Sequence, residues 1–302
     1  MRTGPMLVYL ELIFTAIFWG GTFVAGRIVA PEVGPFSAAF LRFLTASVCL
    51  LALNWRSYGG GMSLPDRRLL ISLILLGLTG VFSYNVFFFM GLERIEAGRA
   101  SLIIANNPVF IALFNALIFR ERLYPLAVAG ILLSLTGAGI VITRGNMVHA
   151  LEGGVGPGEL FMFGCVLSWS AYSLIGRRVL IRLTPLVSVT WASVLGMAAL
   201  APPACMEGLF SEIGTLSAPA WMGILYLGIF GTVAGFVLYY RGIREIGPAR
   251  ASQFINLVPV SAILMAALIL DEPLTPSLMV GGLLVLTGIT LTNVASTRAV
   301  KR

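Results

Sequence analysis

The sequence has little charge and almost no histidine. Only 11% of its 302 residues are Asp, Glu, Lys or Arg, whereas a soluble domain carries about 25%. The one histidine, His149, lies in a polar stretch, so a catalytic or zinc site built on histidines is excluded. The three cysteines lie far apart inside apolar runs without a C-x-x-C pair, as small buried hydrophobic residues do. These shortages predict no metal, no cofactor and no disulfide framework.

The sequence is rich in long apolar runs. Apolar and aromatic residue types make up 58% of the chain. A membrane-spanning helix needs about 20 predominantly apolar residues, and the runs lack the alternation of a membrane β-barrel. We therefore expect an all-α polytopic protein with ten transmembrane helices, surrounded by a lipid bilayer. The predicted spans are Leu7–Ala30, Phe36–Asn54, Leu69–Met90, Gly98–Phe119, Tyr124–Thr143, Gly158–Leu180, Thr184–Met206, Ala220–Tyr240, Ala249–Leu270 and Thr275–Val294.

The predicted loops differ in charge between the two sides of the bilayer. Fifteen of the 20 basic residues lie in loops on the side of the N-terminus, and four lie in loops on the other side. Cytoplasmic loops carry an excess of Lys and Arg, so we expect a protein of the cytoplasmic (inner) membrane with both termini in the cytoplasm. This distribution accounts for the net charge of +7 without a nucleic-acid partner.

The chain contains two copies of one sequence unit. Residues 91–140 and 242–291 align at a constant offset of 151, with 21 identities in 50 positions and no gap. We therefore predict two repeats, residues 1–145 and 155–302, joined by the Gly-rich linker Gly153–Gly158.

Each copy holds five spans, so the second copy must enter the membrane inverted. The loop charges agree, because Arg120–Arg122 is basic and its duplicate Asp271–Pro273 is acidic. Inverted repeats are the usual architecture of secondary transporters, in which the two halves exchange shapes around a central site. This is the strongest functional indication in the residues themselves.

Three segments carry a resemblance to a known family. The stretch Phe18–Arg27 reads FWGGTFVAGR, and Gly98–Leu123 ends in RERL and is duplicated by Ala249–Leu274. These segments resemble the EamA-type transporters of the drug/metabolite transporter superfamily. The resemblance implies a ten-helix exporter of small metabolites, and the chain is most similar to exporters of aromatic and other amino acids.

Two amides and a proline interrupt the fourth run, at Asn106, Asn107 and Pro108. The proline removes an intrahelical hydrogen bond and frees a carbonyl, which makes it a candidate gating kink. Either the amides satisfy this broken backbone, or at least one faces a transport cavity. Neighbouring helical residues point about 100° apart, so the two amides are not expected to line the same wall.

The ninth run carries Gln253 and Asn256, three residues apart and hence on one helix face. Pro259 follows one turn later and is the second candidate for a gating kink. Two amides on one face suit hydrogen bonding to a zwitterion or a neutral polar ligand. Contact between helices is the alternative role.

Aromatic residues at span depth are further candidates for the site. Trp19 and Trp169 are duplicates, so they either share a structural role or form a cavity wall for stacking. Tyr172, one turn after Trp169, extends that wall. Tyr84 and Asn85 have no polar counterparts in the other half, as expected where an asymmetric substrate binds.

Charged and amphipathic residues near the span ends have competing roles. Glu11 lies a few residues inside the first span. Its expected role is to lie at the membrane interface, to form part of a gate, or to couple transport to a proton. Arg42 lies inside the second span, and the sequence names no partner for it. Tyr239 and Tyr240 are expected in the interfacial aromatic belt, and Glu272 is expected to bond neighbouring backbone.

These features predict a transporter that exports amino acids, aromatic ones among them, or similar small metabolites by alternating access. Alternatives are export of drugs, lipophilic cations or nucleotide sugars, and a passive channel. An enzyme is not expected, because no deep nucleophile, acid pair or histidine pair is present, and the oligomeric state is left open. The predicted substrate-binding residues are Trp19, Tyr84, Asn85, Asn106, Asn107, Trp169, Tyr172, Gln253 and Asn256, and those for gating or proton coupling are Glu11, Pro108 and Pro259.

Overall fold

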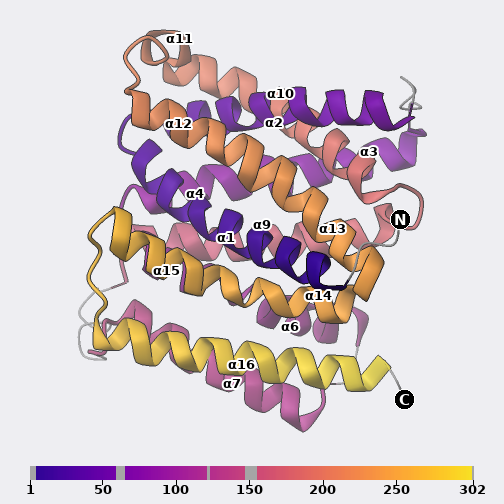
Figure 1. The fold of residues 1–302 in the computed structure, drawn as a ribbon, viewed down its shortest axis with the longest axis vertical. Helices are drawn as coiled ribbons and strands as arrows, with labels where there is room; N and C mark the ends of the chain where they lie inside the picture. Colours follow the sequence, from indigo (N-terminus) through magenta and orange to yellow (C-terminus); the bar gives the residue numbers. More distant parts are fainter. Residues whose placement is uncertain (1–4, 59–64, 121–122, 147–154, 301–302) are drawn as a thin grey trace.

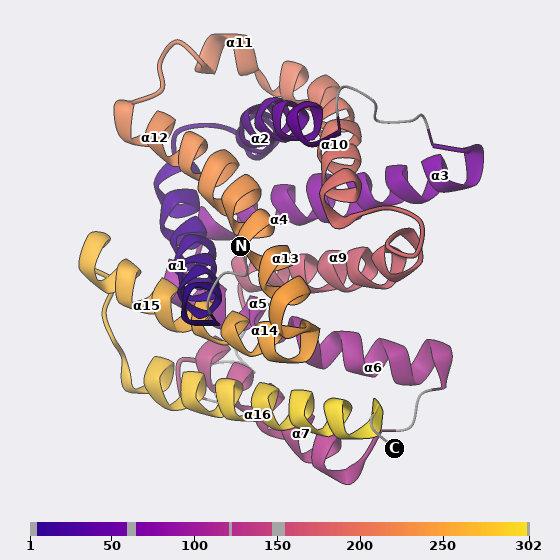
Figure 2. The ribbon, with the colours of Figure 1, turned by 45° about the vertical axis from the view of Figure 1, so that its right-hand side comes forward.

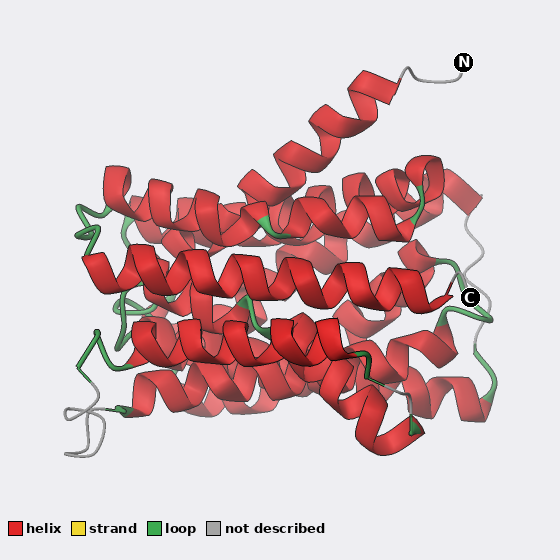
Figure 3. Ribbon diagram, turned by 90° about the horizontal axis from the view of Figure 1, so that it is seen from below, coloured by secondary structure: helices red, strands yellow, loops and turns green. Residues whose placement is uncertain are grey.

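Every regular element is a helix in the part of the chain that the structure describes. The computed structural model describes residues 5–58, 65–120, 123–146 and 155–300. Ten helical spans within these ranges are long and apolar enough to cross a membrane, and Figure 3 shows the loops gathered at the two ends of the bundle. The predicted all-α polytopic fold with ten spans is therefore confirmed. His149 and the first two residues of the predicted linker lie outside the described residues.

The first half forms five spans from eight elements. These are α1 (Pro5–Val29), α2 (Pro35–Tyr58), α3 (Arg67–Leu76), the π-helix η1 (Gly77–Ser83), α4 (Tyr84–Leu92), α5 (Ala97–Ile104), α6 (Asn107–Phe119) and α7 (Pro125–Ile142). The third span comprises α3, η1 and α4. The fourth is broken between α5 and α6, where Pro108 lies in the first turn of α6, a position that needs no N–H donor.

The second half repeats this order. Its elements are α9 (Pro157–Val179), α10 (Pro185–Glu207), the short α11 (Leu209–Glu212), α12 (Ala218–Tyr226), the π-helix η2 (Leu227–Ala234), α13 (Gly235–Ile246), α14 (Pro248–Ile255), α15 (Leu257–Ile269) and α16 (Pro276–Val300). The ninth span is broken at Asn256, as the fourth is at Asn106. Both termini lie at the same end of the bundle (Figure 1).

Equivalent helices of the two halves pair in opposite directions at one edge of the bundle. Ser37, near the start of α2, donates its backbone N–H to the Glu207 carboxylate at the end of α10 over 2.7 Å. Asn54, near the end of α2, donates to the hydroxyl of Thr190 near the start of α10 over 2.6 Å. The pair α7 and α16 forms the opposite edge (Figures 1 and 2). An antiparallel arrangement of equivalent helices is what two inverted copies produce.

The interior packing is reciprocal between the halves. The first span, α1, packs against α12, η2 and α13 of the eighth span and against α14 and α15 of the ninth. The sixth span, α9, packs against α3, η1 and α4 of the third and against α5 and α6 of the fourth. The third span therefore packs against the second half, and the eighth span packs against the first half.

The third and eighth spans each contain a π-helical stretch at the equivalent position. The offset of 151 places Gly77 of η1 opposite Gly228 of η2, and Ser83 opposite Ala234. The sequence patterns do not predict these stretches. π-Helical turns are rare and occur frequently at functional sites, so the pair marks the centre of the molecule as the place to look for a site.

Candidate substrate site

The side chain of Arg42 bonds one residue of η2 and one residue of α4 that lies just after η1. Arg42 projects from α2 and is only 8% exposed. Its Nη1 donates to the Oδ1 atom of Asn85 over 2.8 Å, and its Nη2 donates to the Oγ1 atom of Thr232 over 3.4 Å. The Nε atom is buried without a hydrogen-bond partner. Among the described residues, no carboxylate lies within ion-pair distance of this guanidinium.

The two acceptors of Arg42 are held by the π-helical backbone. The Asn85 side-chain amide donates to the carbonyls of Gly80 (3.2 Å) and Val81 (2.8 Å). The Thr232 hydroxyl bonds the carbonyl of Leu227, five residues earlier, over 3.1 Å. A side chain whose other hydrogen bonds are already made has one orientation, so both oxygen atoms are fixed toward the guanidinium.

This polar centre has no counterpart in the other repeat. Arg42, Asn85 and Thr232 form one connected set of polar side chains. At the offsets of 150 and 151, the equivalent positions are apolar. They are Ala192, Phe236 and Val81, respectively. The repeat symmetry that governs the fold is therefore broken at the polar centre, although the surrounding backbone keeps it.

Trp19 bonds the backbone of η2 beside this centre. Its indole Nε1–H donates to the Gly231 carbonyl over 3.0 Å, one residue before Thr232. Its ring lies against those of Tyr239 (centroids 5.3 Å apart) and Phe236 (5.6 Å). Trp19 is half-buried, so it covers the polar centre with an aromatic layer while anchoring the π-helical stretch.

Trp169 forms a second aromatic layer against the third span. Its ring lies 5.5 Å from that of Tyr84 and 5.2 Å from that of Tyr172. The Tyr172 ring lies so close to Gly80 in η1 that any side chain at Gly80 would overlap it. The structure thus brings together five predicted site residues around the two π-helical stretches, namely Trp19, Tyr84, Asn85, Trp169 and Tyr172.

The predicted amides of the fourth span lie elsewhere. The Asn106 side chain donates to the Leu102 carbonyl (2.9 Å) and accepts from the Ser134 hydroxyl (2.8 Å). These bonds are what the broken-backbone alternative expects. The Oδ1 atom of Asn107 is buried without a hydrogen-bond partner, so its role in a site stays a prediction, as does the hinge role of Pro108.

The predicted amides of the ninth span also lie away from the polar centre. Gln253 is exposed, and Asn256 donates to the Thr290 hydroxyl of α16 over 3.4 Å. Pro259 is buried within the first turn of α15. The proposed roles of these three residues in transport stay predictions.

Glu11 forms an ion pair across the halves. Its Oε1 atom lies 2.8 Å from Nη1 of Arg241 on α13, and its side chain is 12% exposed. The pair joins the first and eighth spans. Glu11 lies near the start of α1, and Figure 1 shows that α1 begins at the end of the bundle that holds both termini. This position fits the gating alternative for Glu11, which remains a prediction together with proton coupling.

Sequence reasoning missed several members of the site. Arg42 lies deeper inside a predicted span than any other basic residue of the sequence, and that depth is the available signal. Thr232 gave no signal, because a lone threonine in an apolar helix is ordinary. Tyr239 and Tyr240 are half-buried. The Tyr239 ring packs at a tilt against Trp19, and the Tyr240 ring stacks on Phe236. Their place in an interfacial belt stays a prediction.

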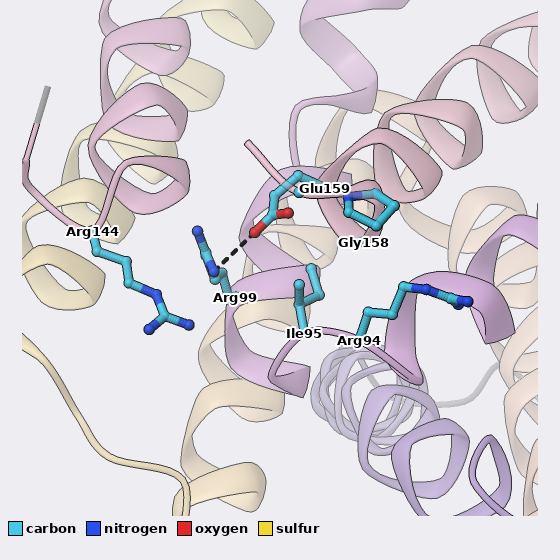
Figure 4. Close-up of a pocket in the computed structure, with 8 residues that line it drawn as sticks. Arg94, Ile95, Arg99, Arg144, Gly158 and Glu159 are labelled. Atoms are coloured by element: carbon cyan, nitrogen blue, oxygen red, sulfur yellow. Dashed lines mark ion pairs between the residues drawn. The ribbon is translucent and has the colours of Figure 1, made fainter. Parts of the chain in front are cut away.

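A separate pocket lies at the opposite end of the bundle from the termini. Its volume is about 490 Å³, and its lining includes Arg94, Arg99, Arg144 and Glu159. Figure 4 shows Arg99 and Glu159 pointing toward each other, with 2.9 Å between Nη1 and Oε1. Arg99 also donates to the carbonyls of Val141 and Ile142 at the end of α7. The charges of Arg99 and Glu159 are therefore matched within the protein.

Three glutamates link the halves at this same end. Glu207 bonds the start of α2 at Ser37 (2.7 Å), and Glu272 bonds the Ala97 N–H at the start of α5 (2.7 Å), so the expected backbone role of Glu272 is confirmed. Glu32 accepts hydrogen bonds from the Ser217 hydroxyl (2.6 Å) and N–H (2.9 Å). These two bonds lower the pKa of Glu32 below its ordinary value. This end is thus closed by polar contacts between the repeats.

Ten apolar spans with a buried, asymmetric polar centre define a polytopic membrane protein. The sequence profile of the EamA-like transporter family matches residues 6–143 and 156–294. The chain therefore belongs to the EamA-like transporter family, and it is a membrane transporter.

Curated relatives agree with this assignment. The chain is 29% identical over 283 residues to the uncharacterized transporter YyaM of Bacillus subtilis, covering 93% of this chain and 92% of that protein. It is 28% identical over 284 residues to a probable terminal-alkyne amino-acid exporter of Streptantibioticus cattleyicolor, covering 93% and 92%. It is 27% identical over 296 residues to the uncharacterized inner membrane transporter YicL of Salmonella typhimurium, covering 96% of each.

A solved crystal structure shares the fold. The two structures superpose with a TM-score of 0.65 at 23% sequence identity, over 96% of this chain and 98% of the other. The similarity therefore extends over the whole bundle, including both repeats.

Proposed function

We propose that this transporter exports amino acids or similar small metabolites across the cytoplasmic membrane by alternating access, with both termini in the cytoplasm. The observation that carries the proposal is the asymmetric polar centre of Arg42, Asn85 and Thr232 between two symmetric π-helical stretches. A symmetric scaffold allows the two halves to exchange shapes. An asymmetric polar set within it gives a polar substrate one orientation.

The contacts between the halves support a defined resting state. Glu32, Glu207 and Glu272 each bond backbone of the other half at the end away from the termini. In the proposed topology this end faces outward. Opening toward the outside would break these bonds, and opening toward the cytoplasm would break the pair of Glu11 and Arg241.

The amino-acid substrate is supported by residue chemistry and by one relative. The polar centre supplies hydrogen-bond donors, while the rings around Trp19 and Trp169 supply stacking surfaces. Such a combination suits a small molecule with a polar head and an apolar side chain. The relative named a probable terminal-alkyne amino-acid exporter covers nearly the whole chain.

Two alternative cargoes fit the polar centre less well. A lipophilic cation would be repelled by the buried Arg42, which has no carboxylate partner among the described residues. The two phosphates of a nucleotide sugar would require several cations, and Arg42 is the one cation of this centre.

Efflux from proteoliposomes tests the proposal. Vesicles loaded with a panel of radiolabelled amino acids should release at least one of them faster with protein than without, saturably and with counterflow. Equal release in both preparations across the panel would overturn amino-acid export, and non-saturable release would indicate a channel.

In a cysteine-free background, Tyr58→Cys and Ser211→Cys should react with an impermeant maleimide from opposite sides of the membrane. Labelling of both from the same side would contradict the topology.

A further inference from the structure

We propose that Arg42 binds the carboxylate group of the transported substrate, so that the substrate itself is the counter-ion of this buried arginine. The inference rests on the proposed function for the route to the site and names the chemical group that the site recognises. It follows from the hydrogen bonds and the charge around one side chain.

Arg42 is a buried cation without a counter-ion among the described residues. Arg42 is 92% buried within a membrane span, because only 8% of its surface is exposed. A buried cation in a membrane protein is costly unless an anion pairs with it. The two partners of Arg42 are a neutral amide and a neutral hydroxyl, so the described protein leaves one positive charge without a counter-ion.

The Nε edge of the Arg42 guanidinium has no hydrogen-bond partner in the described protein. Arginine carries five N–H donors in a flat fork, and Asn85 and Thr232 occupy one donor each on Nη1 and Nη2. The Nε–H has no partner. The Nε edge is one of the edges through which a carboxylate binds arginine with two parallel hydrogen bonds.

Two other buried or half-buried arginines each have a carboxylate partner. Arg99 has the carboxylate of Glu159 and two carbonyls, and Arg241 has the carboxylate of Glu11. Both of these arginines therefore have a protein counter-ion, and Arg42 does not. Its counterpart in the other repeat is Ala192, so the fold does not require an arginine at this position.

A site that binds a substrate carboxylate works better without a protein carboxylate next to Arg42. If a protein carboxylate paired with Arg42, a substrate carboxylate would have to displace it. Asn85 holds the guanidinium by a neutral bond instead, which leaves the charge available. An aspartate at this position would have the same shape and would supply the missing counter-ion, but it would lose the two hydrogen bonds that the Asn85 amide donates to Gly80 and Val81.

The variant Asn85→Asp therefore separates the two possible roles of Arg42. We expect Asn85→Asp to weaken binding of carboxylate substrates by at least about tenfold, because the new carboxylate pairs the buried charge, while binding of the matching carboxamides changes less. A purely structural Arg42 predicts an equal change for acids and carboxamides in this variant, and that result would overturn the proposal.

Direct substitution completes the test. Purified wild type, Arg42→Lys and Arg42→Gln are compared by thermal shift and proteoliposome efflux with L-phenylalanine, L-leucine and L-methionine, each beside its carboxamide. Wild type should prefer acids over amides at least about tenfold, Arg42→Lys should keep part of this preference, and Arg42→Gln should lose it. The matched control is Arg182→Gln, which removes an exposed arginine that pairs with Asp66 and should keep the preference.

The outcomes distinguish this inference from the proposed function. Transport of amino acids and their amides at equal rates would overturn the role of Arg42 and leave export intact. No amino-acid transport, together with Arg42-dependent binding of simple carboxylates such as benzoate, would overturn amino-acid export and leave the carboxylate site intact.

Discussion

Gly137 of α7 lies against Gly281 of α16, and the symmetry-related contact joins Gly130 to Gly288. A Cβ atom at Gly137 would lie 2.6 Å from the Gly281 carbonyl oxygen, and one at Gly130 would lie 2.6 Å from that of Gly288. The offset of 151 makes Gly281 the counterpart of Gly130, and Gly288 the counterpart of Gly137. Exchanging the two halves therefore turns the contact of Gly137 with Gly281 into the contact of Gly288 with Gly130. Two inverted copies of one unit require this relationship. Small residues at such crossings let helix backbones touch in a membrane.

Gly137→Ala is therefore expected to destabilise the protein. The added methyl would also lie 2.7 Å from the Val285 nitrogen, and overpacking of this kind costs about 1–3 kcal/mol. Thermal unfolding in detergent measures the effect. The control is Gly139→Ala on the same helix, where a Cβ meets nothing within 4 Å and the better helix propensity of alanine predicts an equal or higher midpoint. Equal midpoints for the two variants would contradict the close approach of α7 and α16.

The two equivalent tryptophans are expected to differ in their contribution to stability. Trp19→Phe keeps a ring but removes the indole bond to the Gly231 carbonyl, at a cost of about 1 kcal/mol. Trp169 stacks on Tyr84 and Tyr172 and has no described hydrogen bond from its indole, so Trp169→Phe should lower the unfolding midpoint less. The comparison of the two midpoints checks this. A larger loss for Trp169→Phe would mean that the Trp19 bond does not stabilise η2.

The ion pair of Glu11 and Arg241 is expected to respond to a charge exchange. Glu11→Arg or Arg241→Glu alone places like charges at a contact of 2.8 Å and should lower both stability and transport. The double variant should recover most of the loss, with a coupling energy of about 1 kcal/mol in a double-mutant cycle. If stability recovers and transport does not, Glu11 has a further role such as proton coupling.

The ten spans could be predicted because the signal for each lies within one continuous stretch of sequence, and the two-repeat organisation is predicted from the same chain. Uniform apolar runs of about 20 residues specify membrane helices whatever their partners, and equal offsets reveal duplicated sequence. Two helices begin one residue earlier than predicted, at Pro35 and Pro157, because proline is favoured in the first turn of a helix. The breaks near Pro108 and Pro259 follow from the missing N–H donor of proline.

The site could be predicted only in part, because it depends on which helix faces meet. Asn85 and Trp169 were identified from polarity and depth, which are local properties. Gln253 has the same local properties, yet tertiary packing leaves it exposed. The partner of Arg42 lies on a different span, and no periodicity along one helix contains that information.

The link between Glu32 and Ser217 is expected to make part of the stability depend on pH. Hydrogen bonds from Ser217 lower the pKa of the Glu32 carboxyl below its ordinary value of 4.5, so the folded state binds the Glu32 proton more weakly than the unfolded state does. This contribution to stability is fully present above the ordinary pKa and is lost as the pH falls through the lowered pKa.

The unfolding midpoint of wild type should therefore exceed that of Glu32→Gln at pH 7, and the difference should shrink as the pH falls below 4.5. In Ser217→Ala the hydroxyl donor is absent and the pKa of Glu32 lies closer to its ordinary value, so the difference should be smaller and its loss should be complete at a higher pH. A difference between wild type and Glu32→Gln that is constant down to acidic pH would show that the carboxylate charge does not hold this end of the bundle closed.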